Sequence, residues 1–182
     1  MENGVTPQEI VAFWTEAGPG AWFTKSAEFD ALCRERFLPA YEAAARGELA
    51  AWEGSAEGAL ALVILLDQMP RNMFRGDPRT WATDPLAREA AERALAKGYD
   101  KDVPRELRQF FYLPFMHAED LAAQERSVRI YEAHGDPENL KWARHHRDVI
   151  ARFGRFPHRN EVLGRKTTPE EAAYLETDPF RG

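Results

Sequence analysis

The stretch ALALVILL, from Ala59 to Leu66, decides the fold class, because it places eight apolar residues in a row without a polar interruption. A helix that is apolar on every side belongs in the centre of a protein. A buried β-strand would show a similar run. However, no other segment has the alternating Val, Ile and Thr pattern of a partner strand. The run therefore predicts a central, buried helix in an all-α protein.

Helix start and stop signals surround this run on both sides. Thr6-Pro7-Gln8-Glu9 combines an N-cap, a proline at the first helical position and an acid that can complete a capping box. Thr168-Pro169-Glu170-Glu171 repeats the design. Further predicted helices begin at Ser26, Asp84, Val103, Glu119 and Asp136, with ends at Gly18, Gly47, Gly98, Pro114, Gly135 and Gly154. Short connections favour antiparallel neighbours, so we predict one all-α domain over residues 1–182, an array of about seven to nine antiparallel helices.

Composition excludes several classes of protein. The chain has 182 residues, of which 44% are hydrophobic, so it can bury a core without a disulfide or a metal. Its one cysteine, Cys33, lies on an apolar helical stripe and is predicted to fill the core. No apolar run is long enough to span a membrane, and the N-terminus lacks a signal-peptide pattern. We therefore expect a cytoplasmic protein without a membrane segment.

Charge is distributed unevenly along the chain. The formal net charge is −6, but Arg144 to Lys166 carries seven basic residues against two acids. Such a concentration is typical of a site for an anion, and it is equally compatible with ion pairs between this segment and the acidic remainder. The overall acidity argues against nucleic-acid binding.

The first polar cluster is LLDQMPRNMFRG, residues 65–76, which carries an apolar helix straight into Asp67. A carboxylate in such a place needs a partner. Arg71 and Arg75 follow at helical spacing, so an ion-paired ladder is expected. Pro70 removes one helical hydrogen bond and leaves a carbonyl free for a ligand or an arginine. The alternative is that these charges only secure the end of the buried helix.

The second cluster is FFYLPFMHAED, residues 110–120, in which His117 follows an apolar run and precedes Glu119 and Asp120. A histidine beside acids can act as a general acid or base. The alternative is a hydrogen-bonded core histidine followed by ordinary acids in the first turn of a helix.

The third cluster is RHHRDVIARFGRFPHRN, residues 144–160. Helical spacing places His146 and Arg147 on the apolar, core-facing side, while Arg144, Asp148 and Arg152 form a surface ion-pair run. The following loop alternates aromatic and cationic residues, including Arg155, His158, Arg159 and Asn160. Two aromatic anchors would aim these cations at one place, as an anion-binding loop requires. Alternatively, the arginines satisfy carbonyls at the end of the helix.

No motif implies a cofactor, and the one combination that could hold a metal is His117, His158 and an acid. The histidines form no i, i+4 pair and no H-E-x-x-H pattern, and His145 and His146 are adjacent, so one helix face cannot present both. Phosphate-loop, dinucleotide and G-x-S-x-G motifs are missing from the sequence. We expect no cofactor.

The three clusters together are similar to the bacterial family called domain of unknown function 924. LLDQMPRNMFRG, FFYLPFMHAEDLAAQERSV and HRDVIARFGRFPHRNEVLGR carry the resemblance, which extends over nearly the whole chain. It implies an all-helical, tetratricopeptide-like fold and no established activity. Ala118 and Ala123 depart from the family pattern, which has Ser and Asp at these positions. The site in this protein is therefore expected to make fewer hydrogen bonds.

Three functional hypotheses follow. The first is a small-molecule site for a carboxylate or phosphate; if the protein is an enzyme, His117, Glu119 and His158 are the candidate catalytic residues. Its candidate ligand-binding residues are the remaining charged and polar members of the clusters: Asp67, Arg71, Arg75, His146, Arg147, Arg155, Arg159 and Asn160. The second is a tetratricopeptide-like module that binds a partner's carboxylates. The third is a structural ion-pair network.

Overall fold

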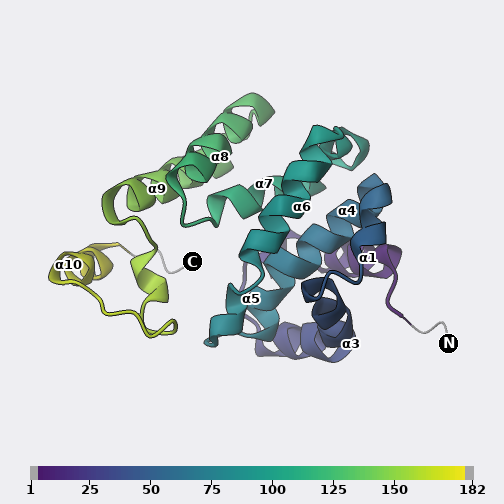
Figure 1. The fold of residues 1–182 in the computed structure, drawn as a ribbon, viewed down its shortest axis with the longest axis horizontal. Helices are drawn as coiled ribbons and strands as arrows, with labels where there is room; N and C mark the ends of the chain where they lie inside the picture. The colour runs from purple at the N-terminus through teal and green to yellow at the C-terminus, as the bar shows by residue number, and fades with distance from the viewer. Residues whose placement is uncertain (1–3, 179–182) are drawn as a thin grey trace. The chain divides into compact units, whose positions relative to one another are not determined.

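The structure is a computed structural model that describes residues 4–178, and in these residues it contains helices and no strand (Figure 1). The predicted all-α multi-helix array is confirmed. Its helices are α1 (Pro7–Ala17), α2 (Pro19–Trp22), α3 (Ala27–Ala45), α4 (Ala56–Val63), α5 (Met69–Met73), α6 (Asp84–Ala96), α7 (Gln109–Met116), α8 (Leu121–His134), α9 (Pro137–Phe153) and α10 (Pro169–Thr177). None of these helices is long and apolar enough to cross a membrane.

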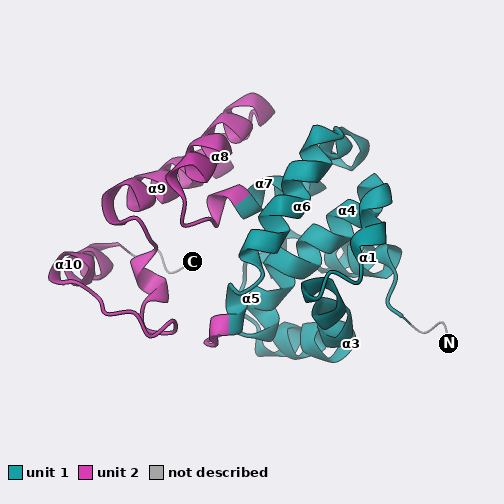
Figure 2. Ribbon diagram, viewed as in Figure 1, with its two compact units in different colours: residues 1–75, 79–114 teal, residues 76–78, 115–182 magenta. Residues whose placement is uncertain are grey.

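The chain divides into two compact units, which Figure 2 shows in different colours. Unit 1 comprises Met1–Arg75 and Arg79–Pro114, and unit 2 comprises Gly76–Pro78 and Phe115–Gly182. One domain over residues 1–182 stays a prediction.

Unit 1 is built around the apolar run that opens the sequence. α4 contacts both α1 and α6, and Ala59 to Leu66 are all buried, which confirms the predicted central helix. Large side chains from other helices complete the core: the rings of Trp14 and Phe110 meet edge to face with centroids 5.8 Å apart. The chain continues from α4 through a π-helical turn, Ile64–Gln68, into α5. The apolar run thus ends in a wider turn that carries Asp67 and Gln68.

Local capping signals are reproduced closely. Thr6 and Thr168 form the predicted capping boxes with Glu9 and Glu171. Ser26 caps α3, whose helix continues through Pro39. Cys33 is fully buried, and burial raises the pKa of its thiol to about 12, as expected of a core residue.

The helix predicted from Val103 to Pro114 is wrong. Pro104 has an extended backbone, a short 3₁₀ turn covers Arg105–Leu107, and α7 begins only at Gln109. Pro114 lies inside α7 instead of ending it, and the helix stops two residues later at Met116.

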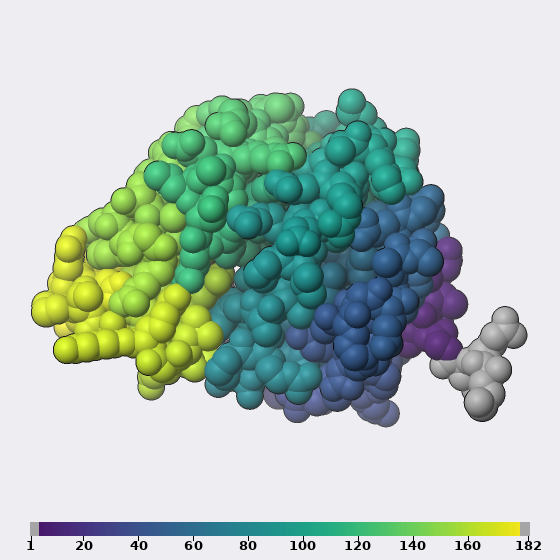
Figure 3. All heavy atoms as spheres, in the orientation of Figure 1, coloured from purple at the N-terminus to yellow at the C-terminus, as the bar shows by residue number. Residues whose placement is uncertain are grey.

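Unit 2 consists of a helical hairpin and a C-terminal segment packed on it. Asp120 caps α8, and α8 packs along α9 after a turn at Gly135. Gly135 and Gly154, where two helices are predicted to end, both have φ of 71°, the left-handed conformation typical of such ends. The chain then passes through a 3₁₀ turn, Pro157–Arg159, to α10. Residues of this C-terminal segment, coloured yellow in Figure 3, cover part of the surface drawn there.

Gly58 gives a direct test of the packing in unit 1. A Cβ atom at Gly58 would lie 2.1 Å from the carbonyl oxygen of Trp52, so Gly58→Ala must displace backbone. We expect a loss of about 1–3 kcal/mol in the free energy of unfolding, measured by urea denaturation. Gly20→Ala, where a Cβ meets nothing within 4 Å, is the control and is expected to change stability little. An equal effect of both substitutions would contradict this packing.

Candidate functional site

The predicted site residues are divided between the two units. Asp67, Arg71 and Arg75 belong to unit 1. The others belong to unit 2: His117, Glu119, His146, Arg147, Arg155, His158, Arg159 and Asn160. Within each unit the structure shows which of these side chains meet.

In unit 1, the π-helical turn buries Asp67 completely, and the amide of Gln68 donates to its Oδ2 at 2.6 Å. Arg71 lies 3.8 Å from Asp67, as predicted, but its closer partner is Asp84, which accepts two hydrogen bonds at 2.9 and 3.0 Å. Arg71 also donates to the carbonyl of Asp67. Burial opposes the charge of Arg71, but Asp84 and Asp67 together raise its pKa. This guanidinium therefore joins two helices, α5 and α6.

Two further sequence predictions for unit 1 are corrected by the structure. The ladder does not extend to Arg75, which instead binds Asp30 of α3 through two hydrogen bonds at 2.8 and 2.9 Å. The carbonyl of Leu66, at the position four residues before Pro70, accepts a hydrogen bond of 2.6 Å from the Thr83 hydroxyl. Asp30, Thr83 and Asp84 were missed because they are distant in sequence from the cluster.

In unit 2, the Glu119 carboxylate joins the start of the hairpin to the C-terminal segment. Arg165 donates to both of its oxygens, at 2.7 and 2.8 Å, and the backbone N–H of Phe156 donates at 2.8 Å. Arg165 also donates to the Phe156 carbonyl at 3.1 Å. Burial raises the pKa of Glu119, but these donors outweigh it and the pKa is lowered. These donors thus hold Glu119 in its carboxylate form and occupy both of its oxygens.

A second carboxylate, Glu171, continues this network. Arg165 donates to the Asn160 side-chain oxygen at 3.0 Å, and the Asn160 amide donates to Glu171 at 3.1 Å. Arg155 holds Glu171 through two hydrogen bonds at 2.7 and 3.0 Å and also donates to the Lys166 carbonyl. Hydrogen bonds from Arg155 lower the pKa of Glu171 to about 2. Arg155 and Asn160 therefore face a carboxylate of the protein itself.

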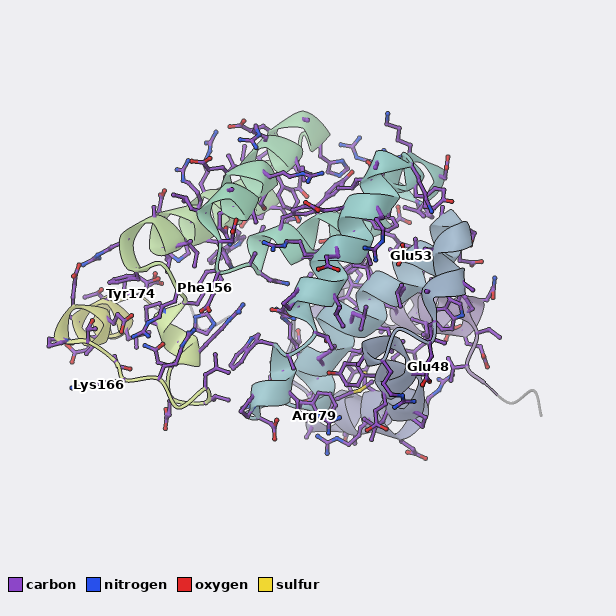
Figure 4. All side chains as sticks on the ribbon, in the orientation of Figure 1. Glu48, Glu53, Arg79, Phe156, Lys166 and Tyr174 are labelled. Atoms are coloured by element: carbon purple, nitrogen blue, oxygen red, sulfur yellow. The ribbon has the colours of Figure 1, made fainter. Side chains whose placement is uncertain are left out.

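Phe156, labelled in Figure 4, is the centre of a histidine–arginine cluster, which we define as His117, His146, His158 and Arg159. The ring centroids of His146 and His158 lie 5.5 and 5.7 Å from that of Phe156. The buried Arg159 guanidinium lies over the same ring at 4.7 Å. Arg159 also donates to the His117 carbonyl at 3.0 Å. The structure thus gathers His146, His158 and Arg159 of the third sequence cluster around one phenyl ring, and Arg159 links them to His117 of the second cluster.

His146 is held as a neutral imidazole. Its Nδ1 lies 2.8 Å from the carbonyl oxygen of Trp142, so this nitrogen carries the proton and donates it. Burial lowers its pKa to about 3, and the nearby His117, His145 and His158 act in the same direction. The prediction that His146 faces the core is confirmed.

The prediction that Arg147 faces the core is wrong. Its side chain is 36% exposed, and it pairs at 2.8 Å with Asp148, its neighbour along the chain. The surface run predicted along α9 is also replaced by other pairs, because Arg144 binds Glu132 at 2.9 Å and Arg152 binds Glu170 at 3.0 Å.

Sequence comparison places this chain in a family. The family described as "Bacterial protein of unknown function (DUF924)" matches residues 10–178. The chain belongs to this family. The fold of this DUF924 protein is similar to the solved structure of a protein of unknown function from Agrobacterium tumefaciens. The sequence identity is 52%, the TM-score is 0.91, and the match covers 94% of this chain and 97% of the other. A search of curated proteins found no significant match.

The network of this DUF924 protein also contains residues that sequence reasoning did not select. In the sequence Arg165 belongs to the basic segment and to the third family stretch, and Glu171 to a capping box, but neither is among the predicted site residues. Glu171 both completes the capping box of α10 and joins the network, because its Oε2 accepts hydrogen bonds from the Thr168 N–H at 2.9 Å and from Arg155 and Asn160. Among the described residues, no group of three or more His, Cys, Asp or Glu side chains is arranged to hold a metal ion.

Glu171→Gln should destabilise the protein by about 2–3 kcal/mol, because it breaks a charge-assisted pair with Arg155. The native pKa of about 2 lies below the usual 4.5, so the contribution is present above pH 4.5 and is lost as the pH falls toward 2. Denaturation of both proteins at several pH values measures the difference. Glu170→Gln, which removes only the exposed pair with Arg152, is the control and should cost less than about 1 kcal/mol. A gap between wild type and Glu171→Gln that is independent of pH would contradict this assignment.

His146 should remain neutral in the folded protein from pH 7 down to about pH 4, since its pKa is about 3. NMR titration of the imidazole resonances measures this directly. The unfolded chain takes up this proton near pH 6.5 and the folded chain does not. His146 therefore lowers stability progressively as the pH falls from 6.5 toward 3. Titration of His146 near pH 6.5 in the folded protein would show that it is not buried as described.

Proposed function

We propose that unit 2 binds a small organic anion, a carboxylate or a phosphate ester, at the histidine–arginine cluster. One observation carries this proposal: the imidazoles of His146 and His158 and the guanidinium of Arg159 pack around the Phe156 ring, and Arg159 also binds the backbone carbonyl of His117. Groups of this kind supply hydrogen-bond donors suited to carboxylate and phosphate oxygens.

The hydrogen bonds of two nearby carboxylates, Glu119 and Glu171, also support an anionic ligand. Glu119 is the acid that most directly adjoins the cluster, and its oxygens are occupied by Arg165 and the Phe156 N–H. Glu171 is occupied by Arg155 and Asn160. Because these acids hydrogen-bond to other residues of unit 2, the positive charge of the cluster favours an anionic ligand.

Any proton transfer on the bound anion would use His117 and His158. Both are partly exposed, and imidazole is the side chain best suited to exchange protons near neutral pH. Glu119, predicted as a third catalytic group, is better suited to positioning, because its lowered pKa keeps it a carboxylate that holds Phe156 and Arg165. His146 would contribute as a neutral hydrogen-bonding group.

The remaining predicted residues fit supporting roles in this proposal. Arg155 and Asn160 orient the loop by binding Glu171, and Arg147 pairs at the surface with Asp148. In unit 1, Asp67 and Arg71 form an internal network with Asp84, as in the structural alternative. We further propose a cytoplasmic location. A tetratricopeptide-like interaction module remains the second candidate function, favoured by the helical hairpin that α8 and α9 form.

Thermal denaturation in 10 mM inorganic phosphate, acetate or succinate tests the proposal, with sodium chloride added to equal ionic strength. A ligand at 100 times its Kd stabilises by about 2.7 kcal/mol, so we expect at least one of these anions to raise the Tm by roughly 5 °C or more. His117→Ala and His158→Ala should each reduce this shift by at least half.

Arg152→Gln is the matched control, because it removes a positive charge from α9 without touching the cluster. It should retain the full shift. The proposal fails if no anion stabilises the protein beyond sodium chloride, or if the two histidine variants keep the wild-type response.

A further inference from the structure

A surface groove of about 620 Å³ runs along the first half of α9 in unit 2. Its walls include Pro137, Leu140, Lys141, Trp142, His145 and Asp178. No residue of the histidine–arginine cluster lines it. Its volume falls in the range of about 300–1,000 Å³ typical of small-molecule sites. The groove is therefore a second location, separate from the one proposed above.

Trp142 forms an aromatic wall of this groove. Its side chain is 38% exposed, although an indole on an amphipathic helix usually turns toward the core. The His145 ring meets it edge-on, with centroids 5.8 Å apart and planes at 89°. His145 Nε2 in turn lies 3.0 Å from Asp178, which also accepts a hydrogen bond from Tyr174. The indole is thus braced while one part of it stays open to solvent, as a stacking surface requires.

Most charges at the groove are already balanced within unit 2. Arg144 binds Glu132 at 2.9 Å, Asp148 accepts from Arg147 at 2.8 Å, and His145 pairs with Asp178. Lys141 differs, because its ammonium group makes no ion pair with any residue from 4 to 178 and lies 5.9 Å from the Trp142 ring centroid. The groove therefore combines one aromatic wall with one cation that pairs with no carboxylate in the described part of the chain.

We propose that this groove binds a small aromatic carboxylate. The aromatic ring of the ligand stacks on Trp142 and contacts the apolar side chains of Pro137 and Leu140, while its carboxylate pairs with Lys141. A neutral aromatic molecule would not pair with the Lys141 ammonium, and a small aliphatic acid would not stack on the exposed part of the Trp142 indole. Charge and shape together thus select a ligand with both features.

Titration of the ¹⁵N-labelled protein with 2-naphthoate, followed by NMR, tests this proposal. We expect a Kd of about 1 mM or lower, with chemical-shift changes centred on residues 137–148. The uncharged 2-naphthamide should bind about three- to fivefold more weakly, which is the effect of an exposed ion pair, and acetate should not bind at the groove. Lys141→Gln should remove the preference for 2-naphthoate over 2-naphthamide.

Variants of the aromatic wall complete the test. Trp142→Ala should weaken 2-naphthoate binding at least tenfold, whereas Trp142→Phe, which keeps an aromatic face, should retain most of it. Lys101→Gln, an exposed lysine of unit 1, is the charge control and should bind as wild type. Equal affinity of Trp142→Ala and wild type, or shift changes centred on Phe156 instead of α9, would overturn the proposal. His158→Ala should leave this binding unchanged, so the failure of one proposal does not imply the failure of the other.

Discussion

The Glu119 carboxylate with its partner Arg165 is the interaction on which unit 2 depends. Glu119 immediately precedes the cap of α8, and its oxygens bind Arg165 and the backbone N–H of Phe156. Through this one side chain, the segment that follows α9 is held against the start of α8. The Phe156 ring is fully buried as a result, and the imidazoles and the guanidinium around it acquire fixed neighbours. A charge that resembles a catalytic acid in the sequence is thus a structural anchor in the fold.

Internal ion pairs also account for most of the positive charge in the basic segment from Arg144 to Lys166. Its excess of positive charge is largely balanced inside unit 2, because partners lie on other elements: Glu132 for Arg144, Glu170 for Arg152, Glu171 for Arg155 and Glu119 for Arg165. Of these pairs, those of Glu119 and Glu171 are the least exposed and contribute most to holding the segment. The charge asymmetry of the sequence therefore reflects internal pairing first and ligand binding second.

Local features of the fold could be predicted from sequence because their causes are local. The capping boxes at Thr6 and Thr168, and the left-handed glycines at Gly135 and Gly154, each depend on residues within one helical turn. The burial of α4 follows from an apolar run that no surface position tolerates. The π-helical turn after α4 could not be predicted from local sequence, because this wider turn depends on the packing around it and not on composition.

The side-chain partners were harder to predict, because they depend on how distant segments meet. Asp30 lies 45 residues from Arg75, and Glu119 lies 46 residues from Arg165. Arg147 shows a different limit of sequence reasoning. Consecutive residues on an α-helix are about 100° apart, so the spacing alone does not separate the core-facing side from its edge. His146 is buried, whereas its neighbour Arg147 lies at the edge of that face and pairs with Asp148. The spacing of charged residues along the sequence is the same for a buried ion-pair network and for a ligand site. The two can be distinguished only once the hydrogen-bond partner of each donor is known.

A double-mutant cycle on Glu119 and Arg165 tests the central claim most directly. Urea denaturation of Glu119→Gln, Arg165→Gln and the double variant gives the coupling energy of the pair, and the same cycle on Glu170 and Arg152 gives that of an exposed pair. A half-buried, doubly hydrogen-bonded anchor predicts a coupling of about 2 kcal/mol for Glu119 and Arg165, against about 0.5 kcal/mol or less for the exposed pair. Equal coupling energies in the two cycles would contradict the account.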